Sequence, residues 1–475
     1  MSVRRSLAWT FSGQIATLFI TFSGSLVLAR LLSPSEMGVY GVGLATAGLI
    51  SIVAVGMSSY VIREVQLTED RRASAFTINA AINAAASGII FASSHLVARY
   101  FHVQNVESVL RLLAIPPLIG IFEFLPNAMS TRNMDFKAIS VIQVGGAILN
   151  TGMTIFLAVE SFSSLSMPYA MIAASLFRVA MFLACLPQYF LLRISFRDWR
   201  PALFFGFRMI SVSGAGQIVQ RLSDIILGAI LGLAALGVYA RASNLASLLF
   251  VNLYGTATAV IFSQLSKSFR ESGILRDTFL RGLEMILALM WPLLIGGAIL
   301  AGPAIRLLYG ERWLAAATPL SLLFVAQFIV LTFGMNWELF VLRDKTVQQT
   351  KYEMARSIVG LVFFSAGCVF GLGGAAFGRI AEAIVGAVLY LPKMPQMAGT
   401  NGRAFLSIYL KSAALTAAAV APSTLLMFAH HWSPQTPIAR VILSVLAGVA
   451  LWALVLRYLR HPLFSEIKIF ISAIS

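Results

Sequence analysis

The chain contains few charged residues and almost no cysteine. Asp, Glu, Lys and Arg make up 11% of its 475 residues, against about 25% in ordinary soluble domains. Hydrophobic residues make up 59%, whereas soluble domains contain roughly 45–50%. A water-soluble protein of this composition could not cover its own apolar surface. The composition therefore excludes a disordered chain, a nucleic-acid module and a single globular enzyme domain, and we expect the lipid bilayer to be its solvent.

The sequence also lacks the patterns that hold metals, cofactors or ATP. Its two cysteines, Cys185 and Cys368, lie in apolar runs, which argues against a disulfide framework and a thiolate metal cluster. The five histidines lack metal-ligand spacing, and there is no Walker-type phosphate loop. We therefore predict no enzymatic activity, no metal and no cofactor, and an energy source other than ATP.

Long apolar runs, by contrast, fill the chain. A helix that crosses a bilayer needs about 20 mainly apolar residues. Windows of that length identify runs at 9–31, 37–62, 75–98, 110–130, 138–159, 168–192, 207–233, 236–265, 281–303, 317–342, 356–372, 375–392, 405–429 and 438–458. The predicted fold is an all-α polytopic membrane protein with about 14 transmembrane helices.

Basic residues gather on one side of the predicted membrane. The face that carries the N-terminus holds 25 of the 35 Lys and Arg residues, and the opposite face holds 6. This asymmetry places the N-terminus in the cytoplasm, and an even number of spans places the C-terminus there too. The formal net charge of +16 then reflects membrane topology and attraction to anionic headgroups. We predict no nucleic-acid partner.

Two tripeptides recur in the same order. Gly13-Gln14-Ile15 and Gly38-Val39-Tyr40 open the first two runs, and Gly216-Gln217-Ile218 and Gly237-Val238-Tyr239 occupy the matching places in runs seven and eight. The offsets are 203 and 199 residues, which indicates a duplication. Six helices separate the copies, so the two halves enter the membrane from the same side as a parallel repeat.

This duplication predicts three domains. They are an N-terminal six-helix lobe at 1–200, a second six-helix lobe at 201–398, and two additional transmembrane helices within 399–475. Two parallel lobes enclose a cavity that rocking can open to either face of the membrane.

Several segments resemble a known transporter family. Residues 28–40, LARLLSPSEMGVY, are similar to the first loop of polysaccharide-export flippases, and residues 130–137, STRNMDFK, are similar to their basic turn after the fourth helix. The duplicated opening and the hairpin helix at 374–391 resemble the same group. This group is the Wzx-like branch of the multidrug/oligosaccharidyl-lipid/polysaccharide exporter superfamily.

The resemblance implies a V-shaped, two-lobed transporter of the bacterial inner membrane. It would move an undecaprenyl-diphosphate-linked saccharide from the cytoplasmic to the periplasmic leaflet for exopolysaccharide or O-antigen biosynthesis. Membrane lipids, and a polysaccharide polymerase or export machinery, are the implied partners. The two additional helices resemble those of lipid II flippases, in which such a pair forms a groove for the lipid tail, although they carry no matching motif.

Six charged residues fall near the centres of predicted spans. Each would cost about 2.5–3.5 kcal/mol if it faced lipid, so we expect all of them to face the protein interior or a wet cavity. They are Glu123, Arg178, Arg221, Asp224, Arg379 and Glu382.

The basic members of this set are candidates for binding the diphosphate. A guanidinium fork matches phosphate oxygens, so we predict that Arg178, Arg221 and Arg379 contact substrate, together with Gln217 on the same helix face as Arg221. A structural role remains open for each arginine. Two of them have an acid three residues away and could be neutralised within one helix, and Arg178 could pair with Glu123 on another helix.

The acidic members are candidates for coupling transport to an ion gradient. We predict this role for Glu123, Asp224 and Glu382. Glu123 has no basic residue three or four positions away, and burial without a cation favours reversible protonation. A hydrogen bond across helices is the alternative. Glu284 and Glu338, nearer the cytoplasmic ends, are expected to pair with Arg281 and Arg343.

Two other functions remain open. A multidrug or organic-cation antiporter would have the same architecture, but an acid-dominated midplane would suit that cargo better than three arginines facing three acids. An integral-membrane polymerase or glycosyltransferase would need a catalytic loop or an acid cluster at the membrane surface, and the short loops offer neither.

Overall fold

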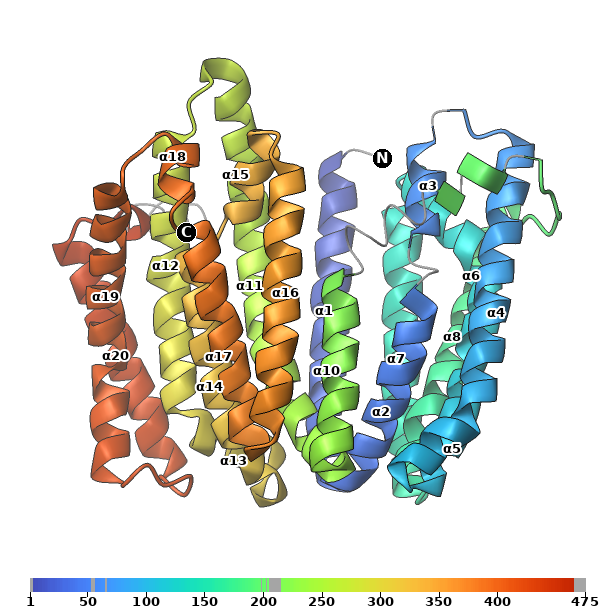
Figure 1. Cartoon of the computed structure of the whole chain (residues 1–475), viewed down its shortest axis with the longest axis horizontal. Helices are drawn as coiled ribbons and strands as arrows, with labels where there is room; N and C mark the ends of the chain where they lie inside the picture. The colour runs from blue at the N-terminus through green and yellow to red at the C-terminus, as the bar shows by residue number, and fades with distance from the viewer. Residues whose placement is uncertain are drawn as a thin grey trace. The chain divides into compact units, whose positions relative to one another are not determined.

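The computed structural model describes residues 3–52, 56–64, 66–197, 199–201, 203–204 and 215–464. Every regular element in these ranges is a helix (Figure 1). The chain divides into two compact units, Met1–Gly237 and Val238–Ser475.

The first unit is built from long helices linked by short turns. In chain order they are α1 (Val3–Leu31), α2 (Pro34–Ser51), α3 (Met57–Arg63), α4 (Glu69–Phe101), α5 (Gln104–Leu113), α6 (Ile115–Arg132), α7 (Phe136–Val159), η2 (Ser163–Leu165), α8 (Ser166–Cys185), η3 (Pro187–Tyr189) and α10 (Ala215–Leu231). Helix α7 packs between α1 and α8, α6 packs against α4 and α8, and α10 packs against α2.

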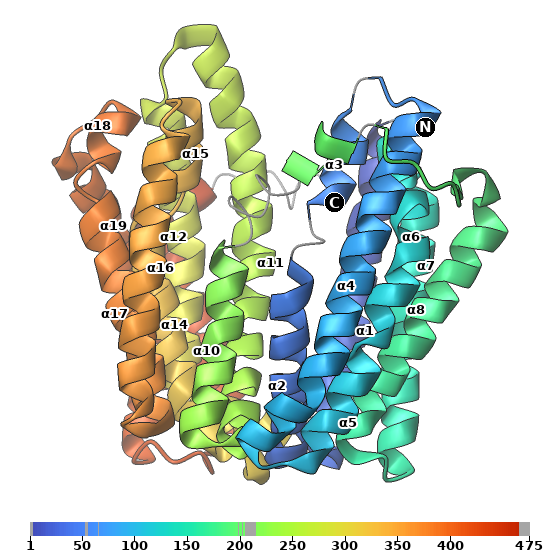
Figure 2. The same cartoon turned by 45° about the vertical axis from the view of Figure 1, so that its right-hand side comes forward.

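The second unit begins within a very long helix. Its elements are α11 (Leu233–Ser272), α12 (Arg276–Ile299), α13 (Ala301–Tyr309), η5 (Glu311–Ala316), α14 (Ala317–Thr332), α15 (Asn336–Leu342), α16 (Thr346–Cys368), α17 (Gly371–Tyr390), α18 (Met394–Ala398), α19 (Gly402–Ala429) and α20 (Ile438–Tyr458). The 40 residues of α11 extend about 60 Å, twice the hydrocarbon core of a bilayer. Figure 2 shows the α11–α12 hairpin projecting beyond the neighbouring helices of this unit.

Eleven helical segments in the described part of the chain are long and apolar enough to cross a membrane. The prediction of an all-α polytopic membrane protein is therefore confirmed. Three further predicted runs coincide with helices outside those eleven, namely α2, α10 and α16. The number fourteen stays a prediction, and the beginning of the predicted run 207–233 lies outside the described residues.

Helix α16 extends well beyond its predicted apolar run. Helix α16 begins at Thr346, ten residues before the predicted run 356–372. Its first half carries Lys351, Glu353 and Arg356. Because these residues are charged, this part of the helix does not form an apolar window. Arg356 therefore lies inside a helix and not at its end.

Glycines bring neighbouring helices into close contact. A Cβ at Gly367 would lie 2.2 Å from the carbonyl oxygen of Gly374, so α16 and α17 touch backbone to backbone near their turn. A Cβ at Gly24 would lie 2.2 Å from the Thr151 methyl, so the backbone of α1 lies directly against a side chain of α7. Helices in a bilayer associate largely through such small-residue packing.

Within the first unit, residues 34–38 and 233–237 lie against each other. A Cβ at Gly38 would lie 1.7 Å from the carbonyl oxygen of Leu233, and a Cβ at Gly237 would lie 2.0 Å from that of Pro34. The first turns of α2 and α11 therefore cross with only glycine between their backbones. This close approach is a physical reason for a glycine at the same place in both copies.

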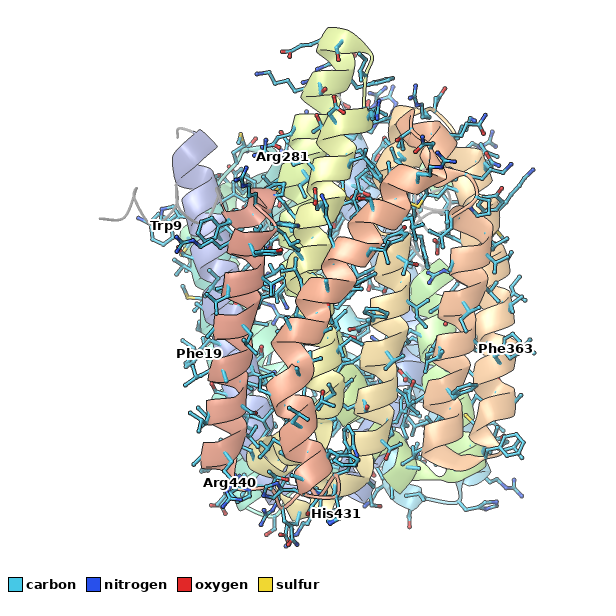
Figure 3. All side chains as sticks on the ribbon, turned by 90° about the vertical axis from the view of Figure 1, so that its left-hand side faces the viewer. Trp9, Phe19, Arg281, Phe363, His431 and Arg440 are labelled. Atoms are coloured by element: carbon cyan, nitrogen blue, oxygen red, sulfur yellow. The ribbon has the colours of Figure 1, made fainter. Side chains whose placement is uncertain are left out.

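Apolar side chains cover the outside of the second unit, and charged ones gather at its ends. Phe363, in the C-terminal half of α16, projects outward with 45% of its surface exposed (Figure 3). Arg281 lies towards one end of the unit, whereas His431 and Arg440 lie at the opposite end (Figure 3).

Candidate functional site

An alternating row of charges joins α16 to α17 in the second unit. The Arg379 Nη1 atom donates to Glu382 Oε2 at 2.8 Å, within α17. Arg356 Nη1, on α16, lies 3.6 Å from the other oxygen of Glu382, and Arg356 Nη2 donates to Glu353 Oε2 at 2.7 Å. Two arginines and two glutamates therefore neutralise one another inside the bundle.

Glycines leave room for this row of charges, and an aromatic ring packs against one of its arginines. A Cβ at Gly360 would lie 2.6 Å from the Glu382 carboxyl carbon, and one at Gly386 would lie 2.9 Å from the Arg356 side chain. The Arg379 guanidinium lies over the ring of Phe364, 4.6 Å from its centroid. A cation–π contact of this kind stabilises a desolvated guanidinium.

The Glu353 end of the row reaches a cavity. The cavity has a volume of about 270 Å³ and is lined by Phe250, Tyr254, Val330, Phe333, Gly334, Asn336, Trp337, Glu338, Glu353 and Arg356. Glu353 Oε1 also accepts a hydrogen bond from the Tyr390 hydroxyl at 2.8 Å. Neither member of the predicted pair Arg379–Glu382 lines this cavity.

A break between two helices forms one wall of the cavity. Helix α14 ends at Thr332 and α15 begins at Asn336. Between them Met335 has a left-handed φ of 59°, and its N–H donates to the Tyr254 hydroxyl at 2.7 Å. Asn336 Nδ2 donates to the Phe333 carbonyl at 3.0 Å. Irregular backbone at membrane depth requires such partners, and it is tolerated where it is enclosed by protein or lines a cavity.

The first unit contains an ion pair between two helices. The Nε atom of Arg178, on α8, donates to both carboxylate oxygens of Glu123, on α6, at 3.0 and 3.1 Å. Arg178 Nη2 also donates to the Ser175 hydroxyl at 3.1 Å, and a Cβ at Gly146 would lie 3.0 Å from the Arg178 side chain. The structural alternative weighed for Arg178 is therefore present, and Glu123 has a cation.

The predicted site residues of α10 are Gln217, Arg221 and Asp224, and Arg221 and Asp224 do not form an ion pair with each other. The Asp224 carboxylate accepts from Gln220 Nε2 at 3.3 Å, and Gln217 is exposed. Arg221 is half-buried and packs against α2, where a Cβ at Gly48 would lie 2.9 Å from its Nε atom. Within the described part of the chain no carboxylate pairs with Arg221. The i,i+3 neutralisation considered for this helix is absent.

Two arginines of the site lie at equivalent places in the predicted repeat. Arg178 and Arg379 are 201 residues apart, within the 199–203 offset of the repeated tripeptides. Each lies on the last helix of its predicted six-helix repeat, and each pairs with a glutamate. This regularity was readable from the sequence, since both arginines fall in matching runs.

Sequence reasoning did not single out the two residues of the row that line the cavity, Glu353 and Arg356. Glu353 lay outside the predicted run 356–372 and Arg356 was its first residue, although their i,i+3 spacing marks an ion pair on a helix. Glu338 was expected to pair with Arg343. That pairing is wrong, because Arg343 Nε donates to the Met397 carbonyl at 2.9 Å. Among the described residues, no group of three His, Cys, Asp or Glu side chains is placed to hold a metal ion.

Sequence comparison relates this chain to polysaccharide biosynthesis. Residues 27–318 match the family described as polysaccharide biosynthesis protein. The teichuronic acid biosynthesis protein TuaB of Bacillus subtilis (strain 168) is 23% identical over 305 residues, a match that covers 62% of this chain and 61% of TuaB. The succinoglycan biosynthesis transport protein ExoT of Rhizobium meliloti (strain 1021) is 21% identical over 463 residues, which cover 96% of this chain and 92% of ExoT.

A solved structure shares the fold. The lipid II flippase MurJ, in an inward closed conformation, superposes with a TM-score of 0.72 over 96% of this chain and 99% of MurJ. The sequence identity is 12%, so the likeness is one of architecture.

Proposed function

Since the chain belongs to the polysaccharide biosynthesis protein family, we propose that this multi-pass membrane protein is a flippase for a lipid-linked saccharide. Its cargo is an undecaprenyl-diphosphate-linked saccharide, which it moves from the cytoplasmic to the periplasmic leaflet for the synthesis of exopolysaccharide or O-antigen. A relative that covers most of the chain is described as a succinoglycan biosynthesis transport protein, and the fold is that of a lipid II flippase.

The observation that carries this proposal is the environment of Arg221. Its guanidinium lies on a helix in a predicted span, and within the described residues it has no carboxylate partner. A cation at this depth costs about 2.5–3.5 kcal/mol unless an anion or water compensates it. A diphosphate supplies that anion and suits the planar fork. Arg178, Arg379 and Gln217 remain proposed substrate contacts, with Arg356 added because it lines the cavity.

The cavity also supports a saccharide cargo. Sugar hydroxyls and a diphosphate lose their hydration if they cross bare hydrocarbon, which is costly for each unpaired group. A path with carboxylate, amide and guanidinium groups provides replacement partners. The polymerase or glycosyltransferase alternative would need a reactive centre in addition to such a path.

The lipid tail has a separate apolar groove in this proposal. A cavity of about 420 Å³ lies between α19, α20 and helices α11, α12 and α13. Its walls include Leu289, Leu293, Val420, Val449 and Trp452. Groups of this kind favour a hydrocarbon chain, so the two additional helices are proposed to hold part of the polyprenyl tail.

The remaining parts of the proposal concern topology and energy. The lobes 1–200 and 201–398 rock about the substrate path, and 399–475 adds the tail groove. The protein lies in the bacterial inner membrane with both termini in the cytoplasm, next to a polysaccharide polymerase or export machinery. An ion gradient drives transport, with Glu123, Asp224 and Glu382 as the proposed coupling acids.

Deletion of the gene tests the flippase proposal. Lipid-linked repeat units should accumulate on the inner leaflet while surface polymer is lost. A deletion strain complemented with the Arg221→Ala variant should make at least tenfold less surface polymer than one complemented with the unmodified gene. The control variant Arg270→Ala, on the exposed end of α11, should restore the polymer fully. Unchanged polymer together with altered drug efflux would favour the multidrug antiporter instead.

A further inference from the structure

The cavity beside the α14–α15 break is lined by aromatic rings as well as by polar groups. Phe250 and Tyr254, on α11, both line it and stack with their ring centroids 5.0 Å apart. Trp337, on α15, lines it too and is 51% exposed. Aromatic surface combined with a small number of placed polar groups is typical of a small-molecule site. The cavity therefore has the composition of a binding site.

The polar groups of this lining are mainly hydrogen-bond acceptors. Glu338 lies in the first turn of α15 with 7% of its surface exposed. Glu353 accepts from Tyr390 with one carboxylate oxygen and from Arg356 with the other, and each oxygen can accept a second hydrogen bond. Asn336 Nδ2 already donates to a backbone carbonyl, so its Oδ1 atom is left to accept. These acceptors favour a ligand that donates several hydrogen bonds.

The charge of Glu338 narrows the choice of ligand further. No cation pairs with its carboxylate in the described part of the chain, whereas Glu353 is paired with Arg356. Hydroxyl groups can donate charge-assisted hydrogen bonds to such a carboxylate. A ligand with a carboxylate of its own would instead meet a like charge there. An uncharged ligand rich in hydroxyl groups is therefore favoured over an acidic one.

A sugar ring meets these requirements together. Its hydroxyl groups donate from the edge of the ring, and its C–H groups suit the negative face of an aromatic side chain. We propose that this cavity binds one uncharged pyranose unit of the lipid-linked saccharide, with Trp337 as the stacking surface and Glu338 as an acceptor for the ring hydroxyls. A volume of about 270 Å³ suits a single ring and is too small for a repeat unit of several sugars. This inference rests on the proposed function, because it assigns a place to one part of that cargo.

The cavity lies towards the predicted cytoplasmic side of the second unit. The α11–α12 hairpin joins the eighth and ninth predicted spans, so it belongs to that side. Figure 1 shows α15 in the half of the second unit from which this hairpin projects. A saccharide that enters from the cytoplasm therefore reaches this cavity before it reaches the middle of the bilayer, and the cavity selects the cargo as it is loaded.

Trp337 provides an intrinsic probe of the site through its indole emission. The full-length protein, purified in detergent, is titrated at constant ionic strength with D-glucose, D-galactose, D-mannose and N-acetyl-D-glucosamine. Each sugar is added to about 200 mM, because a ligand of few atoms binds weakly. The uronate of each hexose is the acidic counterpart, and the open-chain polyol D-mannitol is the control for solvent effects.

We expect a saturable change in emission with at least one of the four uncharged sugars and none with mannitol. Trp337→Phe should abolish the change. Trp432→Phe is the matched control, because Trp432 is also 51% exposed but does not line the cavity, and this variant should keep the change.

The uronates test the role of Glu338. They should bind at least tenfold more weakly than the uncharged sugar that binds best. Glu338→Gln removes the charge and keeps an acceptor oxygen, so it should weaken the uncharged sugar severalfold and largely remove the discrimination against its uronate. The control Glu311→Gln, at a glutamate whose side chain is 68% exposed, should leave both affinities unchanged.

Three results would overturn the proposal. They are no saturable response of the wild-type protein to any of the four uncharged sugars, the same response in Trp337→Phe, and undiminished discrimination against uronates in folded Glu338→Gln protein. This assay measures free sugars, whereas the deletion experiment measures lipid-linked repeat units. Loss of polymer on deletion without sugar binding here would remove the sugar subsite and leave the flippase in place, whereas unchanged polymer on deletion would remove the flippase.

Discussion

The backbone of Gly360, on α16, lies against the carboxylate of Glu382, on α17. A Cβ at residue 360 would lie 2.6 Å from the carboxyl carbon and 2.7 Å from its Oε2 atom. Glu382 holds both Arg379 and Arg356. The absence of one methyl group therefore permits the whole row of charges between the two helices.

Gly360→Ala should displace Glu382 and disrupt its ion pairs. Overpacking of this kind costs about 1–3 kcal/mol, and we expect a comparable loss in the free energy of unfolding, measured by thermal or denaturant unfolding in detergent. Gly152→Ala is the matched control, because a Cβ at that helical glycine meets nothing within 4 Å. Equal stability of the two variants would show that Glu382 moves aside without cost.

The pair Arg178–Glu123 predicts a double-mutant cycle. Arg178→Ala leaves the Glu123 carboxylate, which is 16% exposed, without its cation, and should destabilise the protein by about 3 kcal/mol. Adding Glu123→Gln removes the stranded charge and should recover most of that loss in the same unfolding assay.

The amount of surface polymer made by a strain complemented with the double variant then shows whether Arg178 has only a structural role or also contacts the cargo. If Arg178 contacts the diphosphate, the stable double variant still makes little polymer. Normal polymer from the double variant would show that the ion pair is structural and that Arg178 does not contact the cargo.

Arg356 should be required for transport. It lines the cavity and bridges two glutamates, so Arg356→Ala removes an anion-binding group and leaves two carboxylates close together. We expect at least a tenfold loss of surface polymer at equal protein level in the membrane. Arg356→Lys, which keeps the charge but not the planar fork, should retain intermediate activity, and wild-type activity in Arg356→Ala would refute the assignment.

The end of α20 should be sensitive to pH. His461 follows this helix with its side chain fully buried, its Nε2 atom 3.7 Å from Glu284 Oε1, and burial lowers its pKa below the ordinary value of 6.5. Glu284 also binds Lys411 Nζ at 3.1 Å, which replaces the expected pairing with Arg281. The group thus joins α12, α19 and the segment after α20.

A histidine with a lowered pKa in the folded state stabilises the fold only while it stays neutral. The unfolded chain binds the proton more readily, so the free energy of unfolding should fall as pH drops below about 6.5, by at most about 1.4 kcal/mol per pH unit. His461→Gln should flatten this dependence, measured by unfolding between pH 8 and 5. His431→Gln, at the exposed opposite end of this helix pair, should preserve it. An identical pH profile in His461→Gln would exclude His461 as the titrating group.

The sequence by itself determined the class of fold and the local pairs. Long apolar runs predict membrane helices because a helix satisfies its backbone hydrogen bonds within one segment. The pairing of Arg379 with Glu382 was also foreseeable, because side chains three residues apart on a helix lie next to each other. The matching glycines at residues 38 and 237 also indicated a repeat before their contact was known.

Only the tertiary structure decided which charges remain without a partner. The pairs Arg178–Glu123 and Arg356–Glu382 join different helices, so they depend on which faces pack together, and no spacing along the chain encodes that. The same holds for the helix break beside Glu338 and for the glycines that give the charges room. An acid's neighbours across a packed interface set its charge balance, and for this reason Glu338, which the sequence had assigned to an ion pair, instead lines a cavity without a cation among the described residues.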